Sequence, residues 1–124
     1  MQFQTPRQTA SFEIPDEWWN FAVEPHWSPA STVFPWSGSA EGVQCILLID
    51  VEPPLRDPGV ALFKKYKLIP VLMAFQSPEC ALPPVEVEEV HDSVYRYRVL
   101  NGLHRFYAST AAGYTYLPVM LRRT

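Results

Sequence analysis

Short apolar runs and alternating segments follow one another along this chain, and the pattern predicts a mixture of strands and helices. Residues 43–51 and 68–75 are almost continuously apolar, which is typical of buried strands. Residues 85–88 and 94–100 alternate with a period of two, which predicts a half-exposed hairpin with glutamates facing arginines. Residues 117–121 predict a closing strand.

Three segments have helical features. Pro15 begins the first, over residues 15–23, because proline suits the start of a helix. The second, over residues 60–67, follows Asp57 and Pro58. Its lysines (Lys64, Lys65 and Lys67) are expected at its negative end, with phosphate binding by Lys64 and Lys65 as the alternative.

The third helix is the best defined. Residues 103–112 contain no helix breaker, and Gly113 follows as the glycine expected after a helix end. Asn101 and Gly102 separate this helix from the strand before it. The C-terminal order is therefore strand, glycine turn, helix, strand.

Residues 1–42 form an aromatic, proline-rich extension. Trp27, Phe34 and Trp36 are expected to anchor it to the core, because large aromatic side chains mostly serve burial. The alternative is an exposed aromatic platform for a ligand. The length of 124 residues indicates one domain, with residues 43–124 as its core.

Composition limits the classes of function. Cys45 and Cys80 are expected to be buried thiols, and no zinc site is expected because the histidines do not pair with them at ligand spacing. We find neither an uninterrupted apolar run of membrane-spanning length nor a signal-peptide pattern. A cytoplasmic protein without membrane contact is therefore expected.

Charge is distributed unevenly. The net charge is −3, yet residues 95–124 contain five arginines and no acidic residue. A short cationic segment on an acidic chain favours a local anion site over a broad nucleic-acid surface, so nucleic acid is not expected as a partner. The alternative is that these arginines pair with the glutamates of residues 86–89.

The turn at residues 101–105 has the chemistry of a phosphate site. A glycine between strand and helix allows a ligand to approach the backbone, and the first N–H groups of the helix then face an anion. Arg105 adds a bidentate phosphate partner, and His104 is the candidate proton carrier. The candidate set is Asn101, Gly102, Leu103, His104, Arg105 and Ser109.

Residues 97–108 (YRVLNGLHRFYA), followed by residues 111–114 (AAGY) and 117–119 (LPV), resemble the signature of the ParB/sulfiredoxin superfamily. The resemblance covers roughly residues 43–124 and implies a small α+β fold with a mixed sheet and packed helices. It also implies nucleotide binding, leaving open ATP or CTP with Mg²⁺. Gly102, His104 and Arg105 fall on the phosphate-contacting motif.

Departures from the family pattern restrict the activity. Leu103 stands where sulfiredoxins have their catalytic cysteine, so sulfiredoxin activity is not expected. Asn101 would be a poor base where kinases of this superfamily carry an acid. Two hypotheses remain: a nucleotide- or phosphate-binding domain, with weak hydrolase or kinase activity left open, and a non-enzymatic protein-interaction module that keeps the fold.

Overall fold

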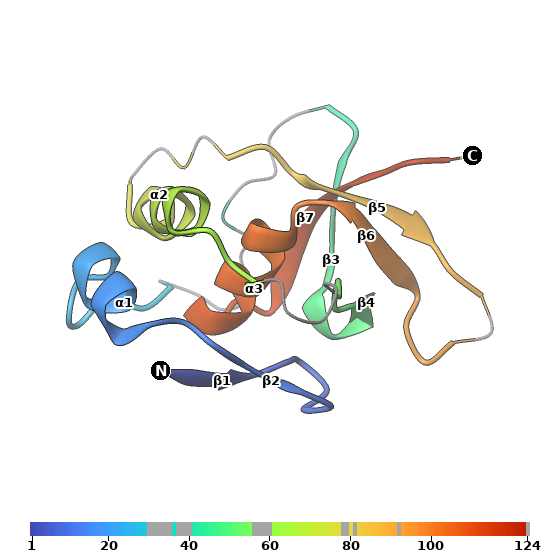
Figure 1. The fold of residues 1–124 in the computed structure, drawn as a ribbon. Helices are drawn as coiled ribbons and strands as arrows, with labels where there is room; N and C mark the ends of the chain where they lie inside the picture. Colours follow the sequence, from blue (N-terminus) through green and yellow to red (C-terminus); the bar gives the residue numbers. More distant parts are fainter. Residues whose placement is uncertain are drawn as a thin grey trace.

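The computed structural model describes residues 1–29, 36, 41–55, 61–77, 80, 82–91 and 93–123. Its centre is a five-stranded mixed sheet in the order β3-β7-β5-β6-β4. The strands are β3 (Val43–Leu47), β4 (Val51–Glu52), β5 (Val85–Glu89), β6 (Tyr97–Asn101) and β7 (Tyr116–Leu121). The helices α2 (Lys65–Phe75) and α3 (Leu103–Ala112) lie side by side against this sheet (Figure 1).

The C-terminal half follows the predicted pattern. Strands β5 and β6 form an antiparallel hairpin in which Glu88 lies opposite Arg98. Helix α3 covers the expected residues and ends at Gly113, which has the left-handed conformation (φ 94°). Strand β7 then returns parallel to β5 and antiparallel to β3. The glycine turn therefore lies at the end of β6, beside the start of β5.

Residues 68–75 are helical, so the prediction of a strand there is wrong. The side chains that α2 buries (Leu68, Ile69, Val71, Leu72 and Phe75) recur with helical spacing. Pro70 lies on the exposed side of α2. Proline has no N–H, so one backbone carbonyl of the preceding turn loses its intrahelical donor and can be solvated instead. Because almost every position of this run is apolar, the helical period could not be recognised in the sequence.

The start of α2 corrects two further predictions. Residues 61–64 are not helical, and residues 56–60, which include Asp57 and Pro58, lie outside the described part. The lysines consequently occupy the positive end of α2, with Lys64 at the cap and Lys65 and Lys67 in the first turn. This end has no acidic residue in its first turn, and none of the described side chains caps it.

The apolar run at residues 43–51 is not one buried strand. It divides into β3, the short 3₁₀ helix η1 (Leu48–Asp50) and β4. Much of β3 is exposed, because it is an edge strand of the sheet. Cys45 is exposed there, which corrects the prediction of a buried thiol, while Cys80 is partly buried. Both cysteines are free, and burial raises the pKa of the Cys80 thiol.

The N-terminal extension packs onto the helices. Strands β1 (Gln2–Gln4) and β2 (Ser11–Glu13) form a two-stranded sheet that the sequence did not predict, followed by the expected helix α1 (Asp16–Ala22). Phe12 enters the main core and contacts the ring of Tyr107 at 4.9 Å between centroids. The described helices include none long and apolar enough to cross a membrane.

Candidate functional site

Gly102 makes the turn between β6 and α3 possible. Its φ of 127° lies in the region that side chains disfavour. A Cβ there would lie 3.0 and 3.1 Å from the two methyl carbons of the buried Val85, and 3.3 Å from Nη2 of Arg105. Among the described residues no side chain caps the start of α3, and the carbonyl of Gly102 accepts the first intrahelical bond, from the N–H of Phe106 (2.9 Å). The predicted role of this turn, to present backbone donors to an anion, stays a prediction.

Arg105 is held by backbone carbonyls. Its Nη1 donates hydrogen bonds to the oxygens of Pro83 (2.7 Å) and Pro84 (2.5 Å), at the entry to β5. Partial burial lowers the pKa of the guanidinium from its usual value, partly offset by the charge of Glu86. Within the described residues it forms no ion pair, so its positive charge is not neutralised by direct contact with a carboxylate.

Two other arginines of the C-terminal segment do pair with glutamates. Arg98 contacts Glu88 at 2.6 Å, and Arg122 contacts Glu86. Asn101 also donates to Glu86 (3.0 Å), and these two hydrogen bonds lower the pKa of the Glu86 carboxyl. The alternative that the arginines of this segment pair with the glutamates of residues 86–89 is thus confirmed for Arg98 and Arg122, whereas Arg105 is positioned differently.

A cavity of about 520 Å³ opens where the starts of α2 and α3 meet. Lys67 reaches it from the first turn of α2, and Arg105 from the first turn of α3. The described residues that line it include no acid; they are Pro54, Leu55, Lys67, Val71, Val99, Leu100, Asn101, Gly102, Leu103, His104 and Arg105. Two helix N-termini and two cations make this cavity electrostatically suited to an anion.

His104 connects the two helix starts. It is only 9% exposed, and its Nε2 accepts a hydrogen bond of 3.0 Å from the backbone N–H of Lys64, the cap residue of α2. Its ring also lies 6.0 Å from that of Phe63. An imidazole that accepts at Nε2 is neutral, with its proton on Nδ1. The sequence proposed His104 as a proton carrier and gave no sign of this cross-helix bond.

Ser109 does not join the other candidate residues. It is fully buried on the core side of α3, where its Oγ accepts a 2.7 Å hydrogen bond from the indole N–H of Trp36. Helical geometry explains this, because Ser109 follows Arg105 by four residues but also Phe106 by three, on the side that faces the core. We therefore remove Ser109 from the candidate site.

The hydrogen bond between Trp36 and Ser109 also indicates whether the aromatic residues of the extension pack in the core or form an exposed platform. Trp36 is 7% exposed and packs against Phe75, with 5.8 Å between ring centroids, and Trp27 packs partly buried against the core. Core packing is thus confirmed for Trp27 and Trp36 over the exposed platform. Phe34 lies outside the described residues.

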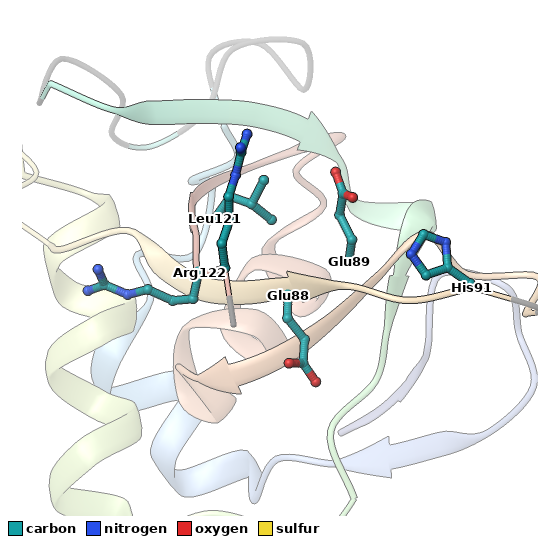
Figure 2. A pocket seen from close by; sticks show the side chains of 6 residues that line it. Glu88, Glu89, His91, Leu121 and Arg122 are labelled. Carbon is teal, nitrogen blue, oxygen red and sulfur yellow. The ribbon is translucent and has the colours of Figure 1, made fainter.

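A second cavity, of about 390 Å³, lies at the other end of β5 (Figure 2). Glu88 and Glu89 leave the strand in opposite directions there, and His91 lies farther along the chain. Leu121, Arg122 and Arg123 complete the lining. Because acids and cations share it, and Arg122 is already paired with Glu86, this cavity suits an anion less well. No metal-binding cluster of histidine, cysteine and acidic side chains occurs among the described residues.

Comparisons with known proteins give structural matches alone. No protein-family model and no curated protein matches the chain. It is similar to a crystal structure of the C-terminally truncated chromosome-partitioning protein ParB from Caulobacter crescentus in complex with CTP-gamma-S. That match has a TM-score of 0.52 and 20% identity, and it covers 67% of this chain and 45% of that one.

A second match is the same truncated ParB complexed to the centromeric parS site, with a TM-score of 0.45 and 21% identity. It covers 64% of this chain and 38% of that chain, so this chain spans less than half of the ParB chains that it matches. The expectation that nucleic acid is not a partner gains no support from these comparisons. Over the shared region, the chain has the ParB-like α+β fold that its C-terminal pattern predicted.

Proposed function

We propose that this chain binds a nucleotide or another phosphate-bearing ligand in the cavity at the start of α3. The observation that carries the proposal is the meeting of two helix N-termini, which no described side chain caps, with Lys67 and Arg105 at one cavity. Backbone N–H groups and both side chains would donate to phosphate oxygens. The ParB of similar fold was crystallised with CTP-gamma-S, which supports a nucleotide as the ligand class.

The remaining lining suits the rest of a nucleotide. Leu55, Val99 and Leu100 give one part of the cavity an apolar surface for a base or sugar. A volume of about 520 Å³ is within the range of small-molecule sites. The residues therefore divide into a cationic part for phosphate and an apolar part for a planar group.

Magnesium has no protein carboxylate here among the described lining residues. Mg²⁺ in nucleotide sites is usually held by one or two carboxylates together with the phosphates. The described residues thus do not fit a resident Mg²⁺, and phosphate charge would be balanced by Lys67, Arg105 and the helix starts. ATP and CTP both remain as candidate ligands on this basis.

We propose ligand binding alone, without a chemical step. Leu103 offers neither a nucleophile nor a base, and Nε2 of His104 already accepts from the backbone of Lys64. We therefore assign His104 to holding the two helix starts together. Hydrolase and kinase activity stay predictions without a described residue to perform them.

Isothermal titration with ATP, CTP, ADP, CDP and pyrophosphate tests the proposal. Arg105→Ala and Lys67→Ala should each weaken binding by about tenfold or more, because a hydrogen bond to a charged group contributes about 1.5–3 kcal/mol. Arg98→Ala is the matched control, since it removes an arginine that is paired with Glu88 outside the cavity. Absence of heat with every ligand at millimolar concentration would refute the proposal.

Lys67→Ala distinguishes the loss of a ligand contact from a perturbation of the fold. Arg105 also fixes the carbonyls of Pro83 and Pro84, so its loss perturbs the fold as well as the site. Lys67 is exposed and makes no such bond among the described residues. Equal affinity in Lys67→Ala and the unmodified chain would remove α2 from the proposed site.

A further inference from the structure

The outward surface of α1 and α2 carries large apolar side chains. Phe21 is 73% exposed, Tyr66 69% and Met73 50%, and Pro70 is exposed between the last two. We call these four residues the α1–α2 face. Tyr66, Pro70 and Met73 recur at spacings of four and three, so they lie along one side of α2. A seam of this kind on a helix is typical of helix–helix interfaces, and exposed side chains of this size indicate an interaction surface.

The α1–α2 face is hollowed and held in shape. A cavity of about 320 Å³, lined by Phe21, Met73 and Glu24 among others, lies between the helices. Gln76 fixes their relative position: its Nε2 donates to the carbonyl of Ala22 (2.5 Å), and its Oε1 accepts from the N–H of Glu24 (2.8 Å). A surface that is already ordered loses less entropy when a partner docks.

Opposite charges stand at the two ends of this face. Glu24 adjoins Gln76 at the C-terminal end of α2, and Lys64 stands at the N-terminal end, with its Nζ 6.0 Å from the centre of the Tyr66 ring. Pro70 is midway, because six residues separate it from both Lys64 and Gln76. Neither Glu24 nor Lys64 forms an ion pair within the described residues.

This arrangement is complementary to itself. If a second copy is turned by 180° about an axis through Pro70, its α2 runs antiparallel to the first. The apolar residues then face one another, and each Glu24 meets the other copy's Lys64. A two-fold interface requires such a self-complementary patch. We propose that the α1–α2 face is the interface of a symmetric dimer of this chain.

The proposed dimer is independent of the proposed ligand site. Lys67 and Val71 line the anion cavity from α2, whereas Pro70 and Met73 belong to the α1–α2 face. The absence of nucleotide binding would therefore leave the dimer proposal in place.

Sedimentation equilibrium of the 124-residue chain over a range of concentrations is the test. We expect a mass of twice 14.2 kDa at high concentration and dissociation on dilution. Phe21→Asp and Met73→Asp should each shift the protein to the monomer mass. Val94→Asp is the matched control, because Val94 is an apolar residue with a similar exposure of 71% outside the α1–α2 face.

Charge exchange then tests the antiparallel arrangement. Glu24→Lys and Lys64→Glu should each weaken the dimer at low salt, because they place like charges opposite one another. The chain with both exchanges should dimerise again. A monomer at every concentration, a dimer insensitive to Phe21→Asp, or a double exchange that does not restore association would overturn the proposal.

Discussion

Replacing Gly102 by alanine tests whether close packing at the turn before α3 is a structural requirement. Two penalties are expected. A residue with a Cβ at this positive φ costs about 1–2 kcal/mol. The new Cβ would also lie 3.0 Å from a methyl carbon of Val85, which is fully buried, and overpacking of this kind costs about 1–3 kcal/mol. The free energy of unfolding should therefore fall by about 2–5 kcal/mol.

Gly113→Ala is the matched control for this experiment. Gly113 also has a positive φ, of 94°, but apart from its own chain neighbours and helix backbone no atom of the described residues lies within 4 Å of the position that its Cβ would occupy. It should lose only the conformational part, about 1–2 kcal/mol. Both substitutions reduce the entropy of the unfolded chain equally, so the difference between them reports the contact with Val85 together with the less favourable φ of Gly102.

Urea unfolding followed by tryptophan fluorescence measures both variants against the unmodified protein. Gly102→Ala should also lose the proposed nucleotide binding, because the Cβ would be 3.3 Å from Nη2 of Arg105 and would displace the guanidinium. Gly113→Ala should keep it. Equal destabilisation of the two variants would refute the packing at Gly102 that we describe.

Two further predictions follow from single side chains. His104→Leu should lower the free energy of unfolding by about 1–3 kcal/mol, because the N–H of Lys64 loses its acceptor. In urea unfolding, His104→Gln should recover part of this lost stability. Equal stability of the two variants would contradict the cross-helix bond. Burial, with a contribution from Cys80, raises the pKa of Tyr114 from its usual value of 10.0 to about 12. The fold thus favours the neutral phenol, so the contribution of Tyr114 to stability is complete below pH 10 and is lost as the pH rises toward 12. Tyr114→Phe should remove a late step from the titration of tyrosinate absorbance. An unchanged titration would contradict this.

The C-terminal pattern could be interpreted from sequence because local chemistry dominates there. Alternation with a period of two defined β5 and β6, and Gly102 and Gly113 marked both ends of α3. Residues 68–75 could not be assigned in this way. A continuous apolar run satisfies both a buried strand and a buried helix, and packing of Leu72 and Phe75 in the core selected the helix.

In the candidate site, too, some features follow from local sequence and others from packing between distant segments. A glycine turn with an arginine in the next helical turn could be predicted from the residues alone, because glycine tolerates that backbone best and the motif is contiguous. Packing, in contrast, brings Lys67 to the same cavity as Arg105, places His104 against the start of α2 and turns Ser109 toward Trp36. These pairs are distant in the chain, and their contacts depend on how α2 and the extension pack on α3, which no local pattern encodes.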